Sequence, residues 1–187
     1  MSKIALSPNA SGTGVFTIAS PSGNTDRTLT LPDEAGTVLT TAGVPASAMP
    51  AGSVIQVVSV QFNTQTATSS GTYVDTNLQA SITPTSSASR ILALVTIGGF
   101  ELTSAAQAAY FNLTRDSTQI FQPSGYVGYP NSSIRTYPAP SFTFLDTPAT
   151  TSSTTYKVRF FTASALGLLT INCNGSQSSI TLMEIAA

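Results

Sequence analysis

Apolar and polar residues alternate over short stretches of this chain, the pattern of β-strands with one buried face. In residues 77–82, for example, Leu78, Ala80 and Ile82 alternate with polar neighbours. The same pattern predicts ten short strands after residue 53, separated by clusters of Ser, Thr, Gly and Pro. They are expected at residues 54–62, 72–75, 78–83, 90–97, 109–114, 119–121, 141–145, 156–162, 168–173 and 179–185.

Two of these segments carry more specific information. Residues 91–95 are apolar on both faces of their strand, so this strand is expected in the middle of a sheet or beneath a neighbouring subunit. Residues 113–118 place a polar tip between two hydrophobic strands, which predicts a hairpin with Arg115 and Asp116 at its turn. With no convincing helix, the predicted fold is all-β: an antiparallel β-sandwich with a jelly-roll-like arrangement.

The first fifty residues have a different pattern. Short alternating stretches occur at residues 15–18, 27–31 and 38–40, too few for a private core, so this segment needs identical chains or a larger protein as a partner. A small-residue, proline-containing stretch at 43–52 predicts a linker between an extended segment, 1–42, and a globular head, 53–187. The residues expected to mediate attachment or oligomerisation are Val15, Phe16, Ile18, Leu29, Leu31, Val38 and Leu39.

Composition narrows the class of protein. Charged residues make up only 8% of the chain, but hydrophobic residues reach 41% and are spread among Ser, Thr, Asn and Gln, which favours a packed core over disorder. No run approaches the roughly 18 apolar residues of a membrane-spanning helix, so no membrane insertion is expected. The formal net charge of −1 offers no basic surface for phosphates, which argues against nucleic-acid binding.

Candidate catalytic chemistry is sparse. The chain has no histidine, which excludes Ser-His-Asp and Cys-His arrangements and, with a single cysteine, predicts no zinc site. No spaced calcium-loop ligands or nucleotide-binding signature occur, so no metal and no cofactor are expected. Cys173 follows Leu169 and Ile171 in strand phase and is expected to be a small buried side chain.

A polysaccharide-degrading enzyme would need only two carboxylates. The candidates after the linker are Asp75, Glu101, Asp116, Asp146 and Glu184. Most of them fall at strand ends or turns, so structural roles are expected and the chain is predicted not to be an enzyme.

The segment richest in recognition chemistry is 122–140, where Tyr126, Tyr129, Arg135 and Tyr137 stand among glycines and prolines. Tyrosines on a proline-stiffened loop offer faces for sugar rings and hydroxyls for hydrogen bonds, which suits a receptor contact. The alternative is that these tyrosines pack onto their own sandwich or across a subunit interface.

Two parts of the sequence resemble known virion proteins. Residues 14–18 and 28–39 together resemble a module of bacteriophage tail fibre proteins. Residues 28–39 read T-L-T-L-P-D-E-A-G-T-V-L. Residues 81–92, 113–117, 146–157 and 179–185 are similar to the C-terminal head of small fibre-like virion proteins.

The resemblance implies a virion protein that forms a homotrimer, docks its N-terminus on a phage tail or baseplate protein, and presents its head to a host glycan or protein. Little sequence separates the N-terminal segment from the head, which favours a short fibre. Two alternatives remain open at this point: a capsid decoration or cement protein, and a polysaccharide-degrading tail enzyme.

Overall fold

The structure is a computed structural model, and it describes residues 11–15, 17, 19, 22–26, 28, 30, 44–45, 48–123, 138–163 and 167–187. The chain divides into two units, Met1–Val38 and Leu39–Ala187. The strands predicted in the N-terminal segment lie largely outside the described residues. The boundary predicted at 43–52 remains a prediction.

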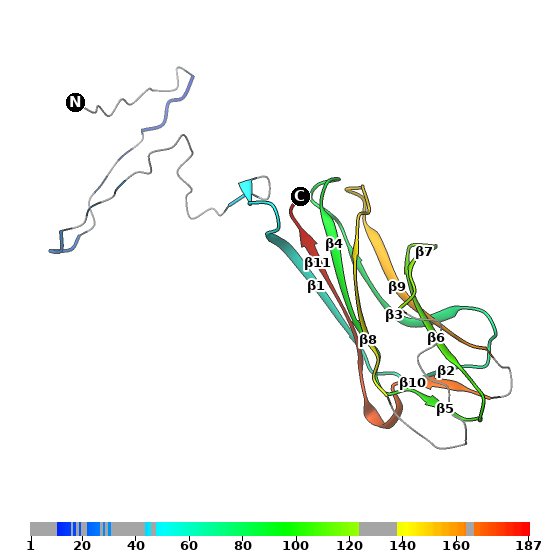
Figure 1. Cartoon of the computed structure of the whole chain (residues 1–187). Helices are drawn as coiled ribbons and strands as arrows, with labels where there is room; N and C mark the ends of the chain where they lie inside the picture. Colours follow the sequence, from blue (N-terminus) through cyan, green and yellow to red (C-terminus); the bar gives the residue numbers. More distant parts are fainter. Residues whose placement is uncertain are drawn as a thin grey trace. The chain divides into compact units, whose positions relative to one another are not determined.

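The second unit is all-β, as the alternation predicts (Figure 1). All strand pairs are antiparallel. The described strands are β1 (Val54–Phe62), β2 (Thr66–Thr68), β3 (Val74–Ile82), β4 (Arg90–Thr96), β5 (Glu101–Leu102), β6 (Ala109–Arg115), β7 (Thr118–Phe121), β8 (Ser141–Asp146), β9 (Thr154–Thr162), β10 (Leu169–Ile171) and β11 (Ser178–Ile185). A 3-10 turn, Cys173–Gly175, precedes β11. Among the described residues, no helix is long and apolar enough to cross a membrane.

The eight longer strands form two four-stranded sheets, in the orders β1-β11-β4-β8 and β3-β9-β6-β7. In both sheets, strands far apart in sequence are neighbours. These two strand orders are those of a jelly roll, which has a double Greek-key topology. A small third sheet, β2-β10-β5, lies at one end of the sandwich (Figure 1). The predicted sandwich is therefore confirmed.

One hydrophobic core fills the space between the two large sheets. On β9, Tyr156, Val158 and Phe160 are completely buried, while the residues between them are partly exposed, so period-two alternation sets the inward face. Full burial of a large apolar side chain stabilises the fold by about 1.5–3 kcal/mol. The largest buried apolar side chains from other strands include Leu78, Ile82, Ile91, Phe111, Leu113, Leu169, Ile171, Ile180 and Leu182.

Several local predictions can be compared with the structure. The strand of residues 91–95 does lie inside its sheet, because β4 pairs with β11 on one side and β8 on the other. The predicted hairpin joins β6 to β7, but its two turn residues are Asp116 and Ser117, one position later than expected. Cys173 is buried, as predicted, and forms no disulfide.

The two strands predicted at 72–75 and 78–83 are one strand, β3, interrupted by an irregularity between Asp75 and Gln79. The hydroxyl of Thr76 donates to the Val158 carbonyl at 2.7 Å and accepts from the Leu78 N–H at 3.1 Å. Asn77 adopts a φ of 69° there, a conformation that asparagine tolerates better than most residues. These bonds replace the missing ladder contacts, so the strand continues.

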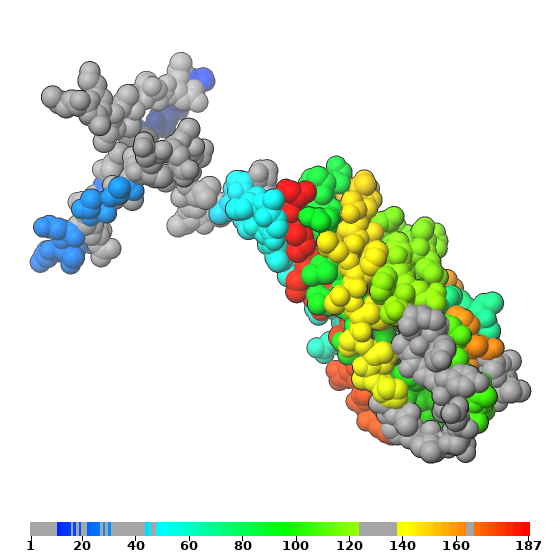
Figure 2. All heavy atoms as spheres, in the orientation of Figure 1, coloured from blue at the N-terminus to red at the C-terminus, as the bar shows by residue number. Residues whose placement is uncertain are grey.

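The ends of the sandwich have different roles, and we name them the base and the tip. The base holds both the entry to β1 and the C-terminus: the Gly52 N–H donates to the Ala186 carbonyl, and the Ala186 N–H to the Ser53 carbonyl, each at 2.9 Å. Figure 2 shows the C-terminal residues, in red, beside the residues that lead into β1, in cyan. The strand register puts Phe62, Ser178 and Ser141 at the opposite end, the tip.

Candidate functional site

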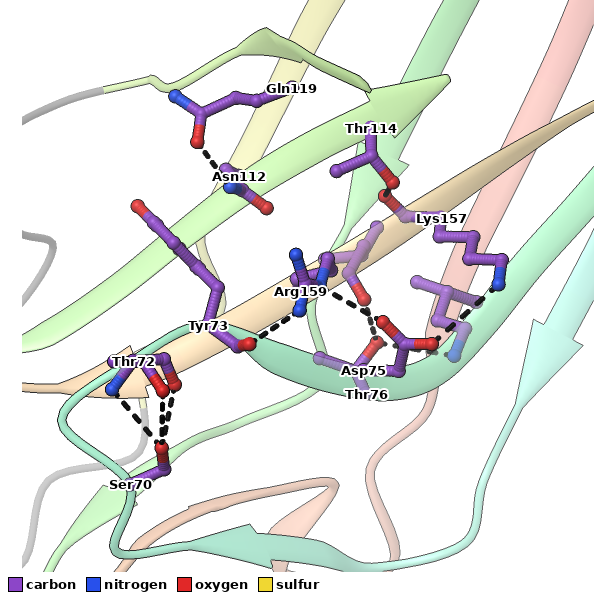
Figure 3. A network of polar contacts seen from close by, with 12 residues as sticks. Ser70, Thr72, Tyr73, Asp75, Thr76, Asn112, Thr114, Gln119, Lys157 and Arg159 are labelled. Carbon is purple, nitrogen blue, oxygen red and sulfur yellow. Dashed lines mark hydrogen bonds and ion pairs between the residues drawn. The ribbon is translucent and has the colours of Figure 1, made fainter. Parts of the chain in front are cut away.

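The outer surface of the β3-β9-β6-β7 sheet carries a network of polar side chains (Figure 3), and we call it the polar face. Alternation along β9 turns Lys157 and Arg159 outward, onto the same surface. The register places Arg159 opposite Asp75 of β3 on one side and Asn112 of β6 on the other. Residues from three strands therefore meet on one surface.

Asp75 forms ion pairs with both basic residues. Its carboxylate oxygens lie 3.0 Å from the Arg159 Nε and 3.6 Å from the Lys157 Nζ. The Arg159 Nη2 also donates to the Tyr73 carbonyl oxygen, which fixes the guanidinium over the strand irregularity of β3. Because all three charged side chains remain partly exposed, these pairs contribute at most about 1 kcal/mol each and stay accessible to other polar groups.

A depression of about 230 Å3 opens on this face. It is lined by Asp75, Thr114, Asp116, Ser117, Lys157 and Arg159. Its lining combines two carboxylates, two cations and two hydroxyls, so it offers both donors and acceptors. Such a lining suits a ligand rich in hydroxyl groups better than one with a single strong charge.

Beside the depression, two buried polar atoms have no hydrogen-bond partner among the described residues. Asn112 is almost fully buried, and its Nδ2 donates to the Gln119 Oε1 at 2.6 Å while its Oδ1 has no partner. The hydroxyl of Tyr73 is also buried without a partner, and burial, followed by the neighbouring Tyr110, raises the pKa of Tyr73. Figure 3 shows Tyr73, Asn112 and Arg159 side by side across the three strands.

An aromatic row crosses the polar face next to these groups. The ring of Phe161 stacks on Tyr110 with centroids 4.3 Å apart, and Tyr73 meets it edge-on at 4.6 Å. Tyr110 and Phe161 are directly opposite in the β6–β9 register. Aromatic contacts of this kind add about 0.5–1.5 kcal/mol each beyond burial. They hold the end of the polar face nearer the tip rigid.

At the base, Asp146 joins the two large sheets. The Tyr156 hydroxyl donates to its Oδ2 at 2.7 Å, and the Arg115 Nη1 lies 2.8 Å from its Oδ1. Burial, followed by the hydrogen bond to Asp146, raises the pKa of Tyr156 far above its ordinary value. This buried cluster is structural, because β8 carries Asp146 whereas β6 and β9 carry its partners.

Glu184 is a fully buried carboxylate, and no ion pair joins it to a cation in the described part of the chain. It accepts hydrogen bonds from the Gln56 Nε2 at 2.5 Å and from the backbone and hydroxyl of Thr85, both at 2.7 Å. Burial alone would raise the pKa of Glu184, but these hydrogen bonds outweigh burial and hold the pKa below its usual value. Glu184 thereby ties β11 to β1 and to the connection between β3 and β4.

These partners bear on the carboxylates considered for glycoside hydrolysis. Asp75 pairs with two cations, Asp116 accepts the Thr155 N–H at 3.0 Å, and Glu101 lies on β5 in the small sheet. Asp146 and Glu184 are committed to the buried clusters at the base. Asp75 and Asp116 alone line a common depression, and each has a structural partner. In the part of the chain that the structure describes, no three His, Cys, Asp or Glu side chains gather as metal ligands would.

The residues predicted to contact a receptor, Tyr126, Tyr129, Arg135 and Tyr137, lie outside the described residues. The described flanks of their segment differ in position: β7 ends at Phe121, opposite Leu113 in the middle of the sheet, and on the other side the Pro138 and Pro140 carbonyls accept the N–H groups of Phe100 and Ile97 near the tip. Of the predicted attachment residues, only Val15 is described, and it is exposed. The other six, Phe16, Ile18, Leu29, Leu31, Val38 and Leu39, are outside the described residues.

The sequence did not identify the rest of the polar face. Asn112, Thr114 and Tyr110 belong to a β6 strand that looks apolar overall, and only the phase of residues 110, 112 and 114 against 109, 111 and 113 marks its outer side. That phase was a usable signal. The ion pair between Asp75 and Arg159 left no such signal in the sequence, because it depends on the pairing of two strands, and these two residues are 84 positions apart.

Comparison with known proteins does not assign a family. No protein-family model matches the sequence, and no curated protein matches it significantly. Solved structures of infectious bursal disease virus VP2 align with the chain: a subviral particle at 14% identity and a TM-score of 0.43, and the Gx strain at 13% and 0.45.

These alignments cover 72% and 70% of this chain but only 34% and 32% of the viral chains, so the matched region spans about a third of their length. At such identities and TM-scores the similarity assigns neither a family nor a function. The jelly-roll topology rests on the strand pairing of this chain itself.

Proposed function

We propose that this chain is a non-enzymatic structural protein of a virion, a short bacteriophage tail fibre that forms a homotrimer. Its N-terminal segment attaches to a tail or baseplate protein, and its jelly-roll head faces the host surface. The tail-fibre-like sequence module at residues 28–39 supports attachment through the N-terminus.

The observation that carries the proposal is that the two ends of the head, the base and the tip, connect to different parts of the chain. The chain enters and leaves the head at the base, whereas the residues that follow the segment with Tyr126, Tyr129 and Tyr137 lead into β8 at the tip. A head tethered at its base presents its tip outward. Tip loops are a suitable place for recognition because a rigid sandwich positions them.

The arrangement of groups on the head suits binding better than catalysis. Jelly rolls include capsid and lectin domains, which is an analogy of fold rather than of site. Each carboxylate whose hydrogen bonds and ion pairs are described above has a structural partner, and the open surfaces offer hydroxyls, amides and aromatic rings. A host glycan, or a protein surface rich in polar groups, matches these groups.

Placement on the particle tests this function. Gold-labelled antibodies against residues 53–187 should mark the tail end of intact phage particles in electron micrographs. Label over the capsid faces would overturn the fibre assignment in favour of a decoration protein, and the absence of label from particles would reject a virion role. Particles that carry the substitutions Tyr126→Ser, Tyr129→Ser and Tyr137→Ser should still contain the protein but adsorb to host cells several-fold more slowly.

A further inference from the structure

The outer surface of the β1-β11-β4-β8 sheet differs sharply from the polar face. The register aligns one apolar residue from each of the four strands: Val57 lies opposite Met183, Met183 opposite Leu92, and Leu92 opposite Leu145. At the edges of this row, Val57 is 53% exposed and Leu145 44% exposed. We call this surface the apolar face.

Two pairs of hydroxyl side chains on the apolar face are hydrogen-bonded to each other. In the next row Ser59 and Thr181 share a hydrogen bond of 2.9 Å, and further toward the tip Ser141 donates to the Thr96 hydroxyl at 3.1 Å. A hydroxyl with a partner can be buried with little loss, whereas an unpaired one costs about 1–3 kcal/mol. This surface can therefore be covered by another protein without leaving those hydroxyls unpaired.

The apolar face is also nearly free of charge. Among its described strand residues the register places a single ionisable side chain, Arg90, at the edge near the base. A strongly charged partner would find nothing to pair with on this surface. The same neutral surface on another copy of the chain is a matching partner, as in symmetric oligomers.

The apolar face is large enough to form the main part of a contact between copies. Four strands about 4.8 Å apart, each with about seven residues rising about 3.3 Å, give a flat area of roughly 440 Å2 per copy. Two such surfaces in contact bury roughly 900 Å2 before the relief of the side chains is counted, which is above the roughly 800 Å2 of most lattice contacts and just below the roughly 1,000 Å2 expected of a specific interface. Contacts elsewhere along the chain would add to this.

We propose that the apolar face is the surface through which heads of this protein pack against one another, with other copies of the same chain as the occupant. The row Val57–Met183–Leu92–Leu145 forms the apolar centre, and the paired hydroxyls form its surroundings. This assignment does not depend on where the protein sits on a particle. It also explains the double-sided apolar pattern of β4, whose outer residues Leu92 and Leu94 remain partly exposed in the single chain.

Two matched variants of the full-length chain test the assignment. The first carries Val57→Lys with Leu145→Lys on the apolar face, and the second carries Gln79→Lys with Thr118→Lys at exposed positions of the opposite sheet. Both add two positive charges to β-strands. Light scattering after gel filtration should give an oligomeric wild type, three times the 19.2 kDa chain mass for a trimer, and the same mass for the second variant.

The first variant should fall to the mass of a single chain at micromolar concentration, while its circular dichroism and cooperative melting remain like those of the wild type. A folded first variant that keeps the wild-type mass would overturn the assignment. So would a monomeric wild type at tens of micromolar. If a monomeric wild type bound phage particles and the first variant did not, the occupant of the apolar face would instead be a particle protein. If the first variant misfolds, Val57→Lys alone, at a single edge position, is tested in its place. A folded monomer would support the assignment, and a folded variant of wild-type mass would overturn it.

Discussion

At the scale of single residues, two tyrosines of the head have opposite surroundings. The Tyr156 hydroxyl is buried and donates to the Asp146 carboxylate, whereas the Tyr73 hydroxyl is buried with no partner among the residues that the structure describes. A hydrogen bond to a charged group contributes more than a neutral one, and an unpaired buried hydroxyl costs stability. The same chemical change, loss of one hydroxyl, should therefore have different effects at the two positions.

We expect Tyr156→Phe to lower the free energy of unfolding by about 1.5–3 kcal/mol, because Asp146 loses its donor from β9. Tyr73→Phe is the matched control and should leave stability unchanged within about 1 kcal/mol, or raise it. Urea unfolding of both variants, followed by tyrosine fluorescence and circular dichroism, measures the difference. Equal destabilisation of the two variants would contradict the structural role assigned to Asp146.

The roles of these residues were only partly predictable. Asp146 was expected to be structural, as one of the carboxylates at strand ends or turns, and it joins the two large sheets. Its partners could not be foreseen, since Arg115 and Tyr156 reach it from the other sheet. Local sequence indicates that a residue is structural, whereas its partner depends on how distant strands pack.

At the scale of elements, alternation predicted the long strands well. β1, β4, β6, β8, β9 and β11 lie within two residues of the expected bounds at each end. β2 and β5 were missed because three residues or fewer carry no detectable period, and β3 was split in two because Thr76 and Asn77 read as a break. The Thr76 side chain bridges that irregularity, and this bridging is a three-dimensional effect.

Glu184 tests how the elements at the base are joined. Its lowered pKa means that the folded state favours the ionised form, so its contribution to stability is present above the carboxyl's unfolded pKa and is lost as pH falls through the folded pKa. Glu184→Gln should destabilise the head by about 1–3 kcal/mol at about pH 7, because the new amide faces the Gln56 amide donor.

The difference between wild type and Glu184→Gln should shrink as the pH falls through the lowered pKa of Glu184 in the folded state, because the wild-type carboxyl becomes protonated. Urea unfolding over a series of acidic pH values measures this difference. A difference that stays constant across this range would mean that the charge of Glu184 is not what stabilises the base.

At the scale of the whole molecule, the sequence indicated a sandwich and an extended N-terminal segment, and the structure supplied the pairing order of the strands. Without that order, neither the polar face nor the apolar face can be drawn, because each is built from strands that are distant in sequence. The proline-rich loop with Tyr126 and Tyr129 was chosen from composition alone. What the strand order contributes to that loop is that the residues after it enter β8 at the tip.

Deleting residues 1–42 should leave a head that folds on its own, because the described core residues all come from after the predicted linker. We expect the truncated chain to keep a strand-rich circular dichroism spectrum and a cooperative melt, while it no longer co-sediments with particles. A truncated chain that cannot fold would show that the predicted boundary is wrong. One that folds and still co-sediments would move the attachment site into the head.

The pairing of Gly52 and Ser53 with Ala186 has a consequence for the history of such a protein. When the first and last residues of a domain are hydrogen-bonded to each other, both of its ends meet the rest of a protein at one place. Domains of this kind can be transferred between genes, or inserted into a surface loop of another protein, without stretching the recipient. The head is thus suited to recombination as an exchangeable cassette, in which a new tip can be acquired while the junction at the base stays the same.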